Sequence, residues 1–142
     1  MKICTFFGHR DCNRNTEQPL RNVLVELIEQ ENVTRFYVGN QGDFDAAVRR
    51  VLIQLAKEYP ICYDVVLAYM PKESNRLDGV PTLFPDGIET VPRRFAVCYR
   101  NQWMLERADY VVTFVEHSWG GAAKYKAMAE KKGKKVITLF NP

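Results

Sequence analysis

The chain has 142 residues, of which 46% are apolar and 26% charged, and its formal net charge is +3. This length fits a single domain covering residues 1–142, and the composition is typical of a globular chain rather than a disordered one. The basic residues are scattered among acids, so nucleic acid is not expected as a partner. The four cysteines form no C-x-x-C pair, which predicts neither a metal site nor a disulfide. No membrane or export signal is present, and we expect a cytoplasmic protein.

Five short apolar runs alternate with helical patterns. The runs cover residues 3–7, 36–38, 62–69, 111–115 and 136–140. Apolar residues spaced three and four apart predict helices around residues 20–28, 44–55, 93–107 and 122–132. Together they indicate an α/β, Rossmann-like fold: a doubly wound parallel sheet of strand order 3-2-1-4-5 with helices on both faces. The remaining segment, residues 70–92, is rich in Pro and Gly, which is typical of a lid, a binding loop, an oligomer contact or a flexible loop.

In this strand order the first and fourth strands are neighbours, and the connections that follow them diverge to opposite faces. Ligands bind in the crevice that this divergence opens at the C-terminal ends of the strands. Three polar loops that contain glycine converge there. Their residues are Gly8, His9 and Arg10 after the first strand, Gly39, Gln41 and Gly42 after the second, and Glu116, His117, Ser118, Trp119, Gly120 and Gly121 after the fourth.

The Gly120–Gly121 pair directly precedes a predicted helix. Glycine lets an anion approach the backbone without a Cβ in the way, and the free N–H groups and the helix dipole attract phosphate. The alternative is that the glycines only permit close packing of the strand and the helix. Arg10 and Lys124 are candidate partners of a phosphate, although either can equally be a solvated surface cation.

Other side chains at the same edge are candidates to contact a ligand. His9 and His117, the only histidines, can bind a ligand, act as acid or base, or be structural. Trp119 can stack on a base or cap the sheet. Asp45 can contact a ribose or only favour the first turn of its helix. Arg100 and Asn101 lie on the helix that precedes the fourth strand, beside this edge.

Several segments resemble the SLOG superfamily, the Rossmann-like group that joins the DprA/Smf proteins with the LOG-type cytokinin-activating phosphoribohydrolases. The segments TFFGHRD, FYVGNQGDFDAAVRRVL, VVLAYMP and RFAVCYRNQWMLERADYVVTFVEHSWGGAAK are most similar to its YpsA-like branch of small bacterial and phage proteins. The resemblance implies a nucleotide-derived ligand similar to ADP-ribose or NAD, without an obligatory cofactor. The family habit, together with apolar residues of the 70–92 segment such as Leu77, Leu83 and Phe84, also indicates a homo-oligomer.

The chain departs from the LOG enzymes at one decisive position. Their Pro-Gly-Gly-x-Gly-Thr-x-x-Glu turn ends in a catalytic glutamate, and this chain has Ala127 there. The resemblance therefore implies a sensor or sequestering module that binds a nucleotide derivative, and it disfavours LOG activity. Two alternatives stay open. One is a hydrolase that cleaves an N-glycosidic or phosphoester bond of a nucleotide, with Glu116, His117 or His9 as acid or base. The other is DprA-like binding of single-stranded DNA.

Overall fold

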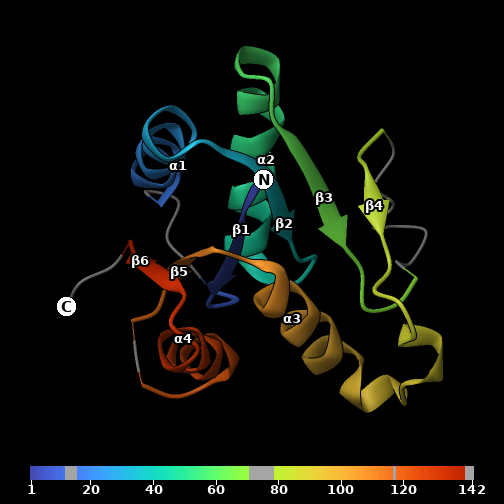
Figure 1. The fold of residues 1–142 in the computed structure, drawn as a ribbon. Helices are drawn as coiled ribbons and strands as arrows, with labels where there is room; N and C mark the ends of the chain where they lie inside the picture. Colours follow the sequence, from blue (N-terminus) through green and yellow to red (C-terminus); the bar gives the residue numbers. More distant parts are fainter. Residues whose placement is uncertain (12–15, 71–78, 117, 140–142) are drawn as a thin grey trace.

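The computed structural model describes residues 1–11, 16–70, 79–116 and 118–139. Its centre is a parallel sheet flanked by helices on both faces (Figure 1). The strands are β1 (Lys2–Gly8), β2 (Val33–Val38), β3 (Cys62–Val66), β4 (Thr82–Leu83), β5 (Tyr110–Phe114) and β6 (Lys135–Thr138). The helices are α1 (Glu17–Glu31), α2 (Gly42–Glu58), α3 (Ala96–Arg107) and α4 (Gly121–Lys131), with short 3₁₀ turns at Ile88–Thr90 and Arg93–Phe95. None of the described helices combines the length and the apolar character needed to cross a membrane.

The strand order is β4-β3-β2-β1-β5-β6. The predicted order is confirmed, because β3, β2, β1, β5 and β6 are the five predicted strands, and β4 is added at the edge beside β3. β4 lies in the 70–92 segment and pairs in parallel with β3, with Val65 opposite Thr82. A two-residue edge strand between prolines carries no alternating pattern, so the sequence did not predict it. Phe84 is exposed and Leu83 half-buried. Leu77 lies outside the described residues, and the homo-oligomer stays a prediction.

Successive side chains of β1 enter two different cores, one on each face of the sheet. Phe6 belongs to the core that contains Leu24 of α1 and Leu52 of α2. Phe7 belongs to the core that contains Met104 of α3 and the aromatic ring of Tyr125 in α4. This alternation is the two-residue period of a strand with both faces covered. Burial on both faces therefore holds the C-terminal end of β1 in a fixed place, from which the first site loop emerges.

The crevice predicted between the first and fourth strands lies between β1 and β5. These strands pair directly, with Thr5 opposite Val111 and Gly8 opposite Phe114. The chain leaves β1 toward α1 on one face of the sheet and leaves β5 toward α4 on the other (Figure 1). The two connections diverge at the edge of the sheet, which is the arrangement that leaves room for a ligand in open α/β sheets.

Candidate functional site

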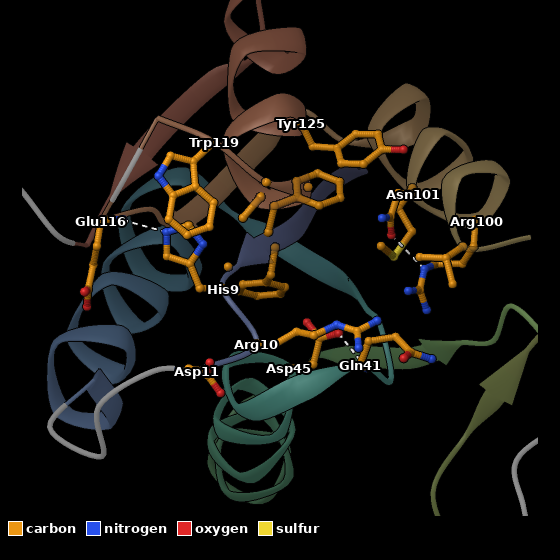
Figure 2. A pocket seen from close by; sticks show the side chains of 18 residues that line it. His9, Arg10, Asp11, Gln41, Asp45, Arg100, Asn101, Glu116, Trp119 and Tyr125 are labelled. Carbon is orange, nitrogen blue, oxygen red and sulfur yellow. Dashed lines mark hydrogen bonds between the residues drawn. The ribbon is translucent and has the colours of Figure 1, made fainter. Parts of the chain in front are cut away.

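A cavity of about 600 Å³ lies at the C-terminal ends of β1 and β5 (Figure 2). The loop after β1, the start of α2, one face of α3 and the β5–α4 loop form its walls. Of the candidate residues named from the sequence, the cavity is lined by Gly8, His9, Arg10, Gln41, Asp45, Arg100, Asn101, Glu116, Trp119, Gly120 and Gly121. The topology therefore brings residues from four distant parts of the chain to one place, as the strand order predicted.

The other candidate residues do not line the cavity. Ser118 and Lys124 are exposed, and the Lys124 ammonium lies 5.5 Å from the centre of the Tyr125 ring. Gly39 and Gly42 lie behind the cavity wall, against other residues of the site. His117 lies outside the described residues.

Three glycines of the site have a packing or backbone reason to be glycine. A Cβ on Gly8 would lie 2.8 Å from Cβ of Phe44 and closer still to two of its ring atoms. A Cβ on Gly39 would lie 2.7 Å from Oδ2 of Asp45. Gly42 has a φ of 87°, and its Cβ would lie 2.6 Å from Cα of Arg10. These glycines let the three loops approach one another, so they are required whether or not a phosphate binds.

The two glycines before α4 differ from those three. Gly120 has φ 95° and ψ 174°, a conformation that is open almost only to glycine. Gly121 has no such constraint, and a Cβ built on it would meet no atom within 4 Å. Packing between strand and helix therefore does not explain Gly121. No carbonyl or side chain in the described part of the chain accepts from the N–H groups of Gly121 and Ala122, which begin α4.

Arg100 places a buried cation in the wall of the cavity. Its side chain comes from α3 and faces the interior on the right of Figure 2, and the residue is only 2% exposed. Its Nε donates to Oδ1 of Asn101 at 2.7 Å, and its Nη1 donates to the carbonyl of Val66 at 2.9 Å. Nη2 has no acceptor among the described residues. Burial lowers the pKa of Arg100, but an arginine stays protonated in proteins, so a positive charge with a free donor faces the cavity.

Asp45 is the buried acid of the cavity. Its Oδ2 accepts the backbone N–H of Gln41 at 2.9 Å. Burial raises the pKa of Asp45 above its usual value. The positive charges of Arg100, Arg49 and Arg10 act in the opposite direction, in that order of strength. Three cations around one carboxylate leave this part of the wall with an excess of positive charge, which suits an anionic group of a ligand.

His9 and Glu116 connect two loops across the mouth of the cavity. The backbone N–H of Glu116 donates to Nε2 of His9 at 2.8 Å, and the His9 ring lies edge-on to Phe114, with centroids 6.5 Å apart. The Nε2 atom is therefore an acceptor in this structure. Both residues were catalytic candidates, and the geometry gives His9 a second role, that of joining the two loops.

Sequence reasoning missed the apolar part of the cavity wall. Val97 and Met104 lie on the face of α3 that also carries Arg100. Val97 is three residues before Arg100 and Met104 four residues after it, a spacing that places all three on one face of a helix and could have indicated this wall from the sequence. Tyr125 of α4 stacks on Phe7 with ring centroids 5.1 Å apart. Burial raises the pKa of Tyr125, which keeps its phenol neutral. This wall offers flat apolar surface beside the polar groups, as small-molecule sites commonly do.

Comparison with solved structures identifies proteins of the same fold. DNA processing protein A (DprA) from Streptococcus pneumoniae has a TM-score of 0.70 and 16% sequence identity, over 97% of this chain and 50% of that one. DprA from Helicobacter pylori, whose structure describes a single-stranded DNA binding mode, has a TM-score of 0.67 and 13% identity, over 96% of this chain and 64% of that one. The chain thus spans half of the first protein and less than two thirds of the second. No protein-family model and no curated protein matches the chain by sequence.

This likeness contradicts the expectation that nucleic acid is not a partner, because the Helicobacter pylori protein, which shares the fold, has a single-stranded DNA binding mode. The expectation rested on the scatter of basic residues along the sequence. The fold gathers Arg10, Arg49 and Arg100 around Asp45, so scatter along the chain is no measure of scatter in space. What the likeness establishes for this chain is the Rossmann-like α/β fold that it shares with the DprA proteins, while the SLOG superfamily and its YpsA-like branch stay predictions.

Proposed function

We propose that the chain binds a nucleotide or nucleotide-derived ligand in the cavity between β1 and β5, as a sensor or sequestering module. One observation carries the proposal: a buried arginine, Arg100, with an uncommitted donor faces the same cavity as the open N-terminus of α4. An arginine and a helix N-terminus are two of the commonest partners of phosphate in proteins.

The rest of the cavity suits the other parts of a nucleotide. The Trp119 side chain is 69% exposed at the rim, where its ring can stack on a base. Asp45 and Gln41 lie together, and Asn101 lies beside Arg100, so that these side chains can accept from and donate to sugar hydroxyls (Figure 2). A volume of about 600 Å³ lies in the range of small-molecule sites and leaves room for a ligand larger than a mononucleotide, such as ADP-ribose or NAD.

The test is native mass spectrometry of the purified protein, followed by thermal-shift titration with AMP, NAD and ADP-ribose. A ligand at 100 times its dissociation constant adds about 2.7 kcal/mol to the free energy of unfolding. We expect a co-purified nucleotide mass or a shift with at least one of the three. The absence of both for all three compounds would refute the proposal.

The variant Gly121→Asp locates the phosphate. A carboxylate in the first turn of a helix stabilises the helix by about 0.3–1 kcal/mol, so this variant should fold at least as well as the wild type. The same carboxylate repels a phosphate at that position, and binding should be lost. Gln102→Glu is the matched control, because it adds the same charge at an exposed position of α3 that does not line the cavity. Equal loss of binding in both variants would show that net charge matters rather than the α4 site.

Binding of single-stranded DNA is the second candidate function, and the fold shared with the Helicobacter pylori protein favours it. The positive charges around Asp45 and the exposed Trp119 are groups that can hold a phosphate and stack on a base of a strand.

Fluorescence anisotropy of a labelled oligothymidylate, measured over a range of salt concentrations, tests this candidate. A strand that neutralises several protein cations loses affinity steeply as salt rises. If the strand binds in the cavity, excess AMP should displace it and Gly121→Asp should weaken it. No binding at low salt would exclude this candidate and leave the small-molecule proposal standing.

A further inference from the structure

The His9–Glu116 contact joins the loop after β1 to the loop between β5 and α4. The donor is a backbone N–H and the acceptor is Nε2 of the imidazole, at 2.8 Å, between residues 107 positions apart in the chain. Glu116 opens the loop that continues through Trp119 and Gly120 to the first residue of α4. On the left of Figure 2 the bond lies beside Trp119 at the mouth of the cavity. It is therefore placed to fix where the N-terminus of α4 begins.

The direction of the bond defines the chemical form of His9. A ring nitrogen that accepts a hydrogen bond carries no proton, so the imidazole is neutral with its proton on Nδ1. Protonation of Nε2 would place a second donor opposite the N–H of Glu116. The bond would then be lost, and the two N–H groups would repel each other.

We propose that His9 is a positioning residue whose neutral imidazole holds the β5–α4 loop in the arrangement that exposes the N-terminus of α4 to the cavity. The inference rests on the proposed ligand site and adds a regulation to it: acidification releases the loop. The charged groups that line the same cavity are Arg10, Asp11, Asp45, Arg100 and Glu116. Because some of these also respond to pH, the experiment compares variants at His9 rather than pH values alone.

Two variants separate positioning from direct contact. His9→Gln keeps an amide oxygen near the place of Nε2 and cannot take up a proton, whereas His9→Leu has a similar bulk and no acceptor. The first measurement needs no ligand: the exchange rate and chemical shift of the Glu116 amide, followed by NMR from about pH 8 to about pH 5. We expect a protected amide in the wild type at the upper pH that loses protection as pH falls. It should stay protected throughout in His9→Gln and be exposed throughout in His9→Leu.

The second measurement is the dissociation constant of AMP for the same three proteins. Loss of one hydrogen bond, about 1 kcal/mol, corresponds to about fivefold weaker binding in His9→Leu, with recovery in His9→Gln. The ratio of the wild-type constant to that of His9→Gln should rise as pH falls. This sign is decisive, because a protonated histidine that touched the phosphate directly would make the wild type bind more tightly at low pH.

The outcomes of the two measurements separate the positioning role of His9 from the nucleotide site. A Glu116 amide that does not change between wild type and His9→Leu would overturn the positioning role. Tighter wild-type binding than His9→Gln at low pH would also overturn it and would make His9 a direct ligand contact. If AMP binds to none of the proteins, the proposed nucleotide site fails for this ligand, while the amide data still establish or refute the connection between the two loops.

Discussion

Gly8 and Gly121 both line the cavity, yet the structure gives them opposite tolerances to a methyl group. The Gly8→Ala variant places Cβ at 2.8 Å from Cβ of Phe44, and closer to the ring atoms Cγ and Cδ2. Phe44 is fully buried and stacks on Phe114 with centroids 6.0 Å apart, so its ring has no free space to move into. Overpacking of this kind destabilises a core by about 1–3 kcal/mol.

Part of that loss is offset, because a Gly→Ala change restricts the unfolded chain and stabilises by about 0.4–1 kcal/mol where the backbone permits alanine. Gly8 does not have a positive φ, so the offset applies. We expect a net loss of about 1–2 kcal/mol for Gly8→Ala, measured as the free energy of unfolding in urea. Gly121→Ala is the matched control, since its Cβ meets no atom within 4 Å and the full gain of about 0.4–1 kcal/mol should appear.

A double-mutant cycle with Phe44→Leu tests the cause. The shorter, more flexible leucine can turn away from the new methyl group, so Gly8→Ala should be less destabilising in the Phe44→Leu background than in the wild type. A Gly8→Ala variant as stable as the wild type would refute the reasoning. Equal effects in both backgrounds would show that the strain arises somewhere other than at Phe44.

Three further outcomes follow from the charged side chains of the cavity. Arg100→Met should lower the free energy of unfolding by about 1–3 kcal/mol, because it removes the hydrogen bonds to Asn101 and to the buried carbonyl of Val66. It also removes the cation that most strongly lowers the pKa of Asp45, so adding Asp45→Asn should recover the part of the loss that arises at Asp45 in the same urea experiment. The pKa of Asp45 is near 3.8 in the unfolded chain and higher in the folded chain. Between these two pKa values the folded chain keeps a proton that the unfolded chain has released. The free energy of unfolding therefore falls as pH rises from the lower pKa through the higher one. The unfolding free energy of the wild type minus that of Asp45→Asn should therefore decrease as pH rises above about 3.8. Arg10→Ala should weaken AMP binding with little change in stability, because the side chain is exposed, and calorimetry would show both.

Most of the fold was readable because it depends on patterns that are local in sequence. The apolar runs and the helical spacings identified five strands and four helices, and general rules of handedness then fixed the order of the strands. β4 was missed because two residues between prolines have no period to detect. The third strand ends at Val66 rather than continuing to Tyr69, since an apolar run does not mark where the backbone pairing stops.

The location of the site was also predictable, but the role of each residue was not. Loops at the C-terminal ends of neighbouring parallel strands must meet, whatever their sequence. Whether Gly8 serves packing or a ligand depends on Phe44, which is far away in the chain. The bond between His9 and Glu116 spans 107 positions and leaves no signal in either neighbourhood. Roles that arise from contacts between distant segments become visible only once the segments are placed in space.

The loops before α2 and α4 look alike in sequence, since each brings glycine to the start of a helix, but only one of them is open to an anion. At α2 the carbonyl of Arg10 accepts the N–H of Asp43 at 2.7 Å, and Asp45 accepts the N–H of Gln41. Two carboxylates also occupy its first turn. The first turn of α4 has no acidic residue and no side-chain cap. Acceptors within the chain have already taken the place of a phosphate at α2, so an anionic ligand of this cavity should bind at α4.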